Sequence, residues 1–275
     1  KIKTIYLEQN KGQGYARNIA VQNAVGEYIL FVDSDDYIDL EACKILYEKA
    51  ELNEFDIVCF DIIEIINNEF KEKKLNYDCS IEGNIDINKR KVLLNSQGYF
   101  TTRMYRRKLI VDNNIKFPIG IHYEDSVFNT LSLLYANSIA KIDSSLYFYL
   151  IRENSSSNSY NKERLYDRIT TTEFLFNEVN LRGIYSKYKP IIDKKYIKMM
   201  VGNIHLCLDM FDRVNENKMK EISINIKRNI ENYKNLNEYK ELDKISKLYL
   251  NLNDISPKLL IIVDRIYKLV LNILR

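Results

Sequence analysis

Residues 26–36 read Gly26-Glu27-Tyr28-Ile29-Leu30-Phe31-Val32-Asp33-Ser34-Asp35-Asp36. The five apolar residues at 28–32 include aromatic and β-branched members, and such an unbroken run is typical of a strand buried on both faces. Three carboxylates follow it almost at once. In open α/β sheets ligands bind just beyond the carboxyl ends of the strands, so we expect these acids to face a ligand crevice.

The close spacing of these three acids indicates a bound cation. Neighbouring carboxylates repel one another, and they stay ionised together only when a cation or several donors face them. Mg²⁺ and Mn²⁺ prefer oxygen ligands, and Mg²⁺ often shares its coordination shell with substrate phosphates. A helix cap beside a solvated turn is the alternative, but the position after a buried strand favours metal and phosphate chemistry.

Composition excludes several classes of protein. The chain has 275 residues, enough for one large domain or two modest ones, and its net charge of +3 is no sign of a nucleic-acid partner. Its four cysteines form no Cys-x-x-Cys pair, which indicates reduced thiols in a cytosolic protein rather than a disulfide frame or zinc site. Two histidines exclude a polyhistidine metal site. No apolar run reaches the roughly 18 residues that span a bilayer.

Before the acids, the sequence predicts a strand, a turn and a helix. Residues 2–7 are a short apolar segment, residues 10–14 contain two glycines that suit a turn, and residues 15–24 have helical periodicity. Arg17 and Asn18 lie near the start of this helix, where a cation opposes the helix dipole. The position of Arg17 indicates an anion nearby, with an ordinary surface arginine as the alternative.

After the acids, the pattern alternates between helices and strands. Asp39 can cap a helix over residues 40–50, and residues 57–60 are a second apolar strand. Residues 67–91 are polar and are expected to form an irregular surface excursion. Residues 103–108 are basic, and a solvated helix face is the favoured interpretation. The more specific alternative is that these basic residues contact a diphosphate or an anionic acceptor.

A second group of acids precedes the next helix. Residues 126–136 are helical in pattern, and Asp125 can serve as their N-cap. That role is compatible with catalysis, because a helix N-terminus favours the ionised carboxylate that a general base needs. Residues 144–151 resemble an aromatic strand. Residues 152–159 form a polar loop that either closes over a ligand or serves as a linker.

From residue 161 the pattern is helical only, so we divide the chain into residues 1–160 and 161–275. The predicted helices cover approximately residues 161–183, 190–211, 219–230, 242–252 and 258–275.

Taken together, the motifs resemble those of a family 2 glycosyltransferase of the GT-A fold, of the bacterial capsule and lipopolysaccharide type. The matching motifs, in the family's order, are residues 12–18, 26–36, 117–118 with 123–125, and 147–157. The resemblance covers about residues 1–160. It implies an α/β fold with a Rossmann-like mixed sheet, followed here by an all-helical C-terminal region. Chains of this family open with a strand–turn–helix–strand that contacts the nucleotide base, so we expect this sheet to be N-terminally incomplete.

The resemblance implies metal-dependent, inverting transfer of a sugar from a nucleotide-diphosphate sugar, a UDP-sugar, to a glycan hydroxyl in surface polysaccharide synthesis. Asp35, with Asp33, would hold Mn²⁺ or Mg²⁺ against the charge that develops on the leaving diphosphate. Asp125 would take the acceptor proton, and Glu124 would orient that base or the acceptor.

The same resemblance assigns a nucleotide-binding set. Asp33 would hydrogen-bond the ribose or a metal-bound water, and Asp36 would support the turn. Arg17 and Arg152 would offset nucleotide and diphosphate charge. Leu150 departs from the family pattern, because relatives often carry a basic residue there, and Arg152 can cover that role. The full set is Arg17, Asp33, Ser34, Asp36 and Arg152.

Two other functions stay open from the sequence. One is a transferase on the same scaffold that moves another nucleotide-activated group, such as a phosphoryl derivative. The other is a non-catalytic carbohydrate-binding or scaffold protein. A homo-oligomer is compatible with either.

The last predicted helix, residues 258–275, bears on where the protein works. It has a wide apolar face and a polar stripe that includes Lys258, Arg265, Lys268 and Arg275. A basic amphipathic helix can lie in a membrane interface. Because the resemblance implies lipid-linked glycan acceptors, we expect a cytoplasmic protein that is peripheral at the inner face of the cytoplasmic membrane. Packing of this helix within the helical domain or across a dimer is the favoured alternative.

Overall fold

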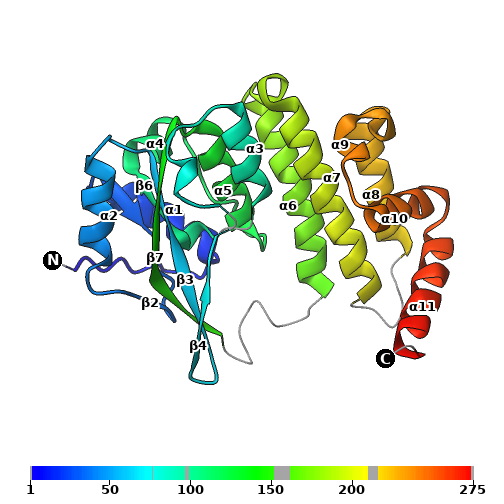
Figure 1. Cartoon of the computed structure of the whole chain (residues 1–275), viewed down its shortest axis with the longest axis horizontal. Coiled ribbons are helices and arrows are strands. Elements are labelled where there is room, and N and C mark those ends of the chain that lie inside the picture. The colour runs from blue at the N-terminus through cyan, green and yellow to red at the C-terminus, as the bar shows by residue number, and fades with distance from the viewer. Residues whose placement is uncertain (1, 76, 97–98, 152–161, 210–215, 274–275) are drawn as a thin grey trace. The chain divides into compact units, whose positions relative to one another are not determined.

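The computed structural model describes residues 2–75, 77–96, 99–151, 162–209 and 216–273 (Figure 1). The chain divides into two compact units, residues 1–159 and 160–275. The first unit contains a mixed sheet with helices, and the described residues of the second form helices and no strand.

Within the described residues, the sheet of the first unit has seven strands. Its main path runs β1-β6-β3-β7-β2, while β4 pairs with β3 and β5 pairs with β7. The two longest strands, β3 and β7, pair in parallel, and all other pairings between the described strands are antiparallel. The strands are β1 Tyr28–Leu30, β2 Tyr37–Ile38, β3 Ile57–Ile66, β4 Glu69–Lys73, β5 Gly83–Asn84, β6 Arg103–Arg106 and β7 Ser138–Ile151.

Apolar helix faces and a cluster of aromatic rings form the core of this unit. Leu46 of α2 packs with Val58 and Phe60 of β3 in one buried cluster. Phe31, directly after β1, has its ring centroid 5.5 Å from Phe117, within a larger aromatic cluster. The helical elements are α1 Gln13–Asn23, α2 Ala42–Glu51, η1 Cys79–Ile81, α3 Ile87–Asn95, η2 Phe100–Thr102, α4 Arg107–Asp112 and α5 Glu124–Tyr135.

The described part of the second unit is entirely helical, which confirms the predicted helical region. Gly183 has φ of 68° and follows the first helix, as expected for a helix C-terminus. Tyr188 is non-helical, so the helix resumes just before Pro190, which lies in the first turn of that continuation. No described helix is long and apolar enough to cross a bilayer. The elements are α6 Lys162–Leu181, α7 Tyr185–Asp209, α8 Glu216–Asn229, η3 Tyr233–Asn235, α9 Asn237–Lys240, α10 Lys244–Ile255 and α11 Pro257–Ile273.

Two strand predictions near the start of the chain were wrong in part. Residues 2–7 form no strand, and the side chains of Ile2 and Tyr6 are 99% and 90% exposed. Among the described strands none pairs with this segment, and an unpaired strand leaves its backbone groups without ladder partners. β1 exists but is an edge strand, and among the described strands it pairs with β6 alone. It is therefore only partly buried rather than buried on both faces.

The polar excursion at residues 67–91 is more ordered than predicted. Asn67 and Asn68 both have positive φ, 51° and 66°, and they form the two-residue connection between β3 and β4. Asparagine tolerates this left-handed conformation, which suits the tight turn of a hairpin. Farther along, the Asp86 side chain accepts a hydrogen bond from the Lys89 backbone N–H and caps α3.

Neither interpretation of the basic segment at residues 103–108 holds for Arg103. Its side chain is fully buried in β6, where the guanidinium donates to Asn129 and lies 3.4 Å from the Tyr77 hydroxyl. This arginine is therefore part of the interior and can neither be solvated nor meet an anionic ligand.

Candidate active site

The acids that follow β1 form a tight turn. The Asp36 backbone N–H donates to the Asp33 carbonyl at 3.0 Å, so residues 33–36 fold back on themselves. Ser34 and Asp35 are exposed, whereas Asp33 and Asp36 are half-buried. This geometry leaves the Asp35 carboxylate accessible to a ligand.

The Asp36 side chain holds this turn against β7. Its two carboxylate oxygens accept hydrogen bonds from the Tyr147 hydroxyl at 2.6 Å and from the Leu150 backbone N–H at 2.9 Å. The same Tyr147 hydroxyl accepts from the Asp33 backbone N–H at 3.1 Å. Burial raises the pKa of Asp36, although these hydrogen bonds oppose the shift. Asp36 therefore fixes the turn, and its oxygens are already occupied.

Arg17 joins the turn to the second acidic motif. Its guanidinium donates to Asp33 at 2.7 Å and to Glu124 at 2.5 Å. The guanidinium carbon lies 4.5 Å from the ring centroid of Phe100, a cation–π distance. Side-chain exposures are 14% for Arg17, 37% for Asp33 and 1% for Glu124. The sequence predicted an anion near Arg17. In this structure the carboxylates of Asp33 and Glu124 are that anion.

The N-terminal part of α1 packs closely against the segment before α5, and this packing positions Arg17. Asn18 is buried and exchanges two hydrogen bonds with the Phe117 backbone, at 2.8 and 2.9 Å. A Cβ at Gly14 would lie 2.4 Å from the Pro118 carbonyl oxygen. Only glycine at position 14 allows the α1 backbone to come this close to Pro118. Together with the Asn18 hydrogen bonds, it explains why α1 packs against the segment before α5.

Glu124 and Asp125 lie in the first turn of α5. The helix N-cap is Tyr123, whose φ is 63°, so Asp125 is not the cap that the sequence offered. Burial raises the pKa of both carboxyls, and the Arg17 charge opposes both shifts. One oxygen of Glu124 is buried and makes no hydrogen bond to a described residue. A half-buried Asp125 with a raised pKa is suited to accept a proton.

The structure thus brings together residues from separate motifs. Arg17, Asp33 and Glu124 are in direct contact, and Asp125 feels the charges of both Arg17 and Asp33. Arg152 lies outside the described residues. The sequence reasoning missed Tyr147 as the residue that holds the turn, although its place in an aromatic strand motif was a signal.

The available carboxylates fit a metal that is shared with a substrate. Among the described residues, no group of three or more His, Cys, Asp or Glu side chains could hold a metal ion by itself. The exposed Asp35 and the partly exposed Asp33 offer two carboxylates, and Asp33 is already paired with Arg17. Mg²⁺ commonly takes one or two carboxylates together with substrate phosphates and water. The residues fit such a shared ion and do not form an all-protein cage.

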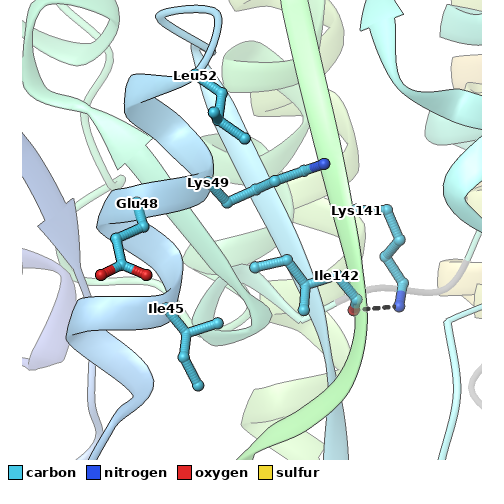
Figure 2. Close-up of a pocket in the computed structure, with 6 residues that line it drawn as sticks. All are labelled: Ile45, Glu48, Lys49, Leu52, Lys141 and Ile142. Atoms are coloured by element: carbon cyan, nitrogen blue, oxygen red, sulfur yellow. Dashed lines mark hydrogen bonds between the residues drawn. The ribbon is translucent and has the colours of Figure 1, made fainter.

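A hollow in the described part of the chain lies away from these acids. It is open, has a volume of about 530 Å³, and lies between α2 and β7 (Figure 2). Lys49 at its edge forms an ion pair with Glu82 at 2.7 Å, and the Lys141 ammonium is turned to Asp61 at 2.8 Å. None of the predicted site residues lines this hollow. It is not the candidate active site.

Sequence comparison agrees with the motif geometry. Residues 1–113 match the profile of Glycosyl transferase family 2. In this segment the chain is similar to glycosyltransferase family 2. The mixed sheet followed by helices is the GT-A type of architecture that the resemblance implied, so the predicted fold class is confirmed.

Several proteins of known name are similar to this chain. The poly(ribitol-phosphate) beta-N-acetylglucosaminyltransferase TarS of Staphylococcus aureus is 31% identical over 63% of this chain and 30% of its own length. The poly(ribitol-phosphate) beta-glucosyltransferase of Bacillus spizizenii is 35% identical over 52% of this chain and 22% of its own. The putative glycosyltransferase EpsH of Bacillus subtilis is 27% identical over 59% of this chain and 48% of its own. The chain therefore matches less than half the length of each.

A solved structure was also found in the comparison. The crystal structure of S. aureus TarS with UDP-GlcNAc aligns with 90% of this chain and 61% of that chain, at 21% identity and a TM-score of 0.46.

The role of Tyr147 can be tested by removing its hydroxyl. Tyr147→Phe leaves the buried ring in place but deletes the hydrogen bonds to Asp36 and Asp33, so we expect the free energy of unfolding to fall by about 1.5–3 kcal/mol in urea titrations. Tyr6→Phe is the control, because Tyr6 is 90% exposed, and it should change nothing. Equal stability of the wild-type protein and Tyr147→Phe would show that the turn does not depend on this contact.

Proposed function

We propose that this protein transfers a sugar from a nucleotide-diphosphate sugar to a hydroxyl group of a glycan acceptor. One observation carries the proposal: Arg17 holds Asp33 and Glu124 together, so the acids of two separate family motifs form one site. The match of residues 1–113 to glycosyltransferase family 2 supports it, as do the names of similar proteins, which are glycosyltransferases. The TarS complex with UDP-GlcNAc supports a UDP-sugar as the donor.

In this proposal Asp125 is the general base. The attacking hydroxyl gives its proton to the Asp125 carboxylate as the bond to the anomeric carbon forms and the bond to the diphosphate breaks. A single base with direct displacement implies inversion at that carbon. Burial raises the pKa of Asp125, which brings the carboxyl closer to the operating pH and makes it a stronger base than an exposed aspartate.

The neighbouring charges keep this base in place and ionised. Arg17 opposes the burial-driven rise in the pKa of both Glu124 and Asp125. Its ion pair with Glu124 also fixes the first turn of α5, where Asp125 lies. We therefore assign Glu124 and Arg17 the role of positioning Asp125.

The turn at residues 33–36 would meet the donor. Asp35, with Asp33, would hold Mg²⁺ or Mn²⁺, which when bound neutralises the charge developing on the leaving diphosphate. Ser34 is exposed beside Asp35 and can contact the nucleotide. Asp36 supports the turn through Tyr147.

The biological setting is part of the same proposal. The names of two similar proteins specify poly(ribitol-phosphate), an alditol phosphate polymer, as what is glycosylated, and this favours a polymer with many hydroxyl groups as the acceptor class. We propose a surface polysaccharide. We place the reaction in the cytoplasm at the inner face of the cytoplasmic membrane, where lipid-linked acceptors would be available.

Donor binding should depend on Asp35. Asp35→Asn removes an exposed carboxylate charge without disturbing a described contact, so we expect calorimetry in Mn²⁺ to show UDP-sugar binding weakened by more than ~10-fold. Asp112→Asn is the matched control, since Asp112 is also an exposed acid of the first unit, and it should bind normally. Unchanged affinity of Asp35→Asn in Mn²⁺ would refute the metal assignment.

Turnover should depend on Asp125. The assay supplies the full chain with a panel of UDP-sugars, Mn²⁺ and glycan acceptors, and mass analysis of the product distinguishes a transferred sugar from a phosphoryl derivative. Asp125→Asn keeps the size of the side chain but cannot accept the proton, so we expect kcat to fall by about 10²–10⁴-fold with donor affinity nearly intact.

The pH profile gives a second readout of the same base. A general base must be deprotonated, so wild-type kcat falls as the pH drops through the pKa of Asp125. Because burial raises that pKa, the fall should begin at a higher pH than for an exposed aspartate, and Asp125→Asn should lack it. Turnover by Asp125→Asn within a few-fold of wild type would exclude Asp125 as the base. Absence of sugar transfer from every donor would contradict the proposed function itself.

A further inference from the structure

Helix α11 is the last described element of the chain (Figure 1). It turns an apolar stripe outward. The members of the stripe recur at intervals of three and four residues, so they lie along one side of the helix. A surface helix normally buries its apolar side. α11 buries Leu260 on its inward side but leaves a further apolar stripe exposed over residues 257–270. The exposed fractions are 39% for Leu259, 55% for Ile262, 56% for Ile266, 61% for Leu269 and 47% for Val270.

Polar contacts on the inward side fix the helix in this rotation. The Tyr249 hydroxyl donates to Asp264 at 2.6 Å, and the Lys268 ammonium donates to Asp264 at 2.9 Å and to Asp209 at 2.6 Å. The Asp264 side chain is only 5% exposed, so its charge depends on these partners. Leu260 is fully buried beside it on the inward side. Rolling α11 to bury its apolar stripe would break the Asp264 contacts.

The outward side of α11 also carries charge of one sign. Lys258 and Arg265 are exposed, and each precedes a member of the stripe, Ile262 or Leu269, by four residues. Residues four apart are neighbours on a helix surface, so both cations border the stripe. The one acid in residues 257–270, Asp264, is turned inward. An outward face of this kind is complementary to an anionic apolar surface.

We propose that α11 docks on an anionic lipid surface, with its apolar stripe among the acyl chains and Lys258 and Arg265 near the head groups. The helix lies in the interface and does not cross it. Pairing with a second copy through the same face is disfavoured, because it would bring cations together without an acid to match them. This docking does not depend on sugar transfer, since it can be measured without donor or acceptor.

Helix α10 offers a second observation of the same type. It exposes three apolar residues on one stripe, at intervals of three and seven residues: Ile245 (47%), Leu248 (46%) and Ile255 (74%).

Vesicle flotation of the full chain tests the proposal. We expect the wild-type protein to float with vesicles of phosphatidylglycerol and phosphatidylcholine, and to float less with phosphatidylcholine alone. Ile262→Gln with Ile266→Gln should lower partitioning by about 10-fold or more, because the stripe is lost. The matched control is Leu181→Gln with Ile224→Gln, which changes exposed apolar residues of α6 and α8 and should float like wild type.

The charge contribution has its own variant. Lys258→Gln with Arg265→Gln should weaken binding to the anionic vesicles by about 30-fold, and it should not change binding to phosphatidylcholine. Lys220→Gln, at an exposed lysine of α8, serves as its control. Circular dichroism verifies that each variant is folded.

Three results would overturn the proposal. One is the absence of wild-type flotation on anionic vesicles, and another is equal flotation of wild type and the Ile262/Ile266 double variant. The third comes from light scattering without lipid: a wild-type dimer that the same double variant dissociates, with no flotation, would assign the stripe to a second copy. Sugar transfer to a soluble acceptor should persist in the double variant, which separates failure of this proposal from failure of the proposed function.

Discussion

The site of this protein depends on one guanidinium. Arg17 lies between Asp33 and Glu124, with Phe100 against its face, and these residues come from α1, the turn after β1, η2 and α5. A carboxylate as buried as Glu124 loses its hydration, and it can stay ionised only beside a compensating charge. The same contact sets the position of the neighbouring Asp125. Structural stability and the arrangement of the acids are therefore tied to one side chain.

The surrounding residues make that contact geometrically possible. Gly14 allows α1 to approach the Pro118 carbonyl, and Asn18 pairs with the Phe117 backbone. On the other side of the site, Tyr147 and Leu150 of β7 hold Asp36. These neighbours hold both carboxylate oxygens of Asp36 and leave Asp35 exposed. A turn that is held by hydrogen bonds and leaves the Asp35 carboxylate exposed is suited to bind a mobile, highly charged donor.

Much of this arrangement could be predicted from the sequence, because apolar periodicity and family motifs are local signals. They located α1, α5 and β3, and the all-helical second unit. The errors concern properties set by distant partners. Burial of Arg103 depends on Asn129 and Tyr77, and the edge position of β1 depends on which strands pair with it. The rotation of α11 about its axis likewise depends on Tyr249 and Asp209. These residues lie outside α11, so the sequence pattern of the helix does not reveal them.

The most direct measurement of the central interaction is a double-mutant cycle on the free energy of unfolding. Arg17→Met leaves Glu124 buried without a counter-charge, whereas Glu124→Gln removes the charge that Arg17 compensates. If the ion pair joins the two motifs, the double variant should be more stable than the sum of the single losses predicts, with a coupling energy of about 1–3 kcal/mol. Additive losses, with a coupling energy near zero, would contradict the claim that this contact organises the site.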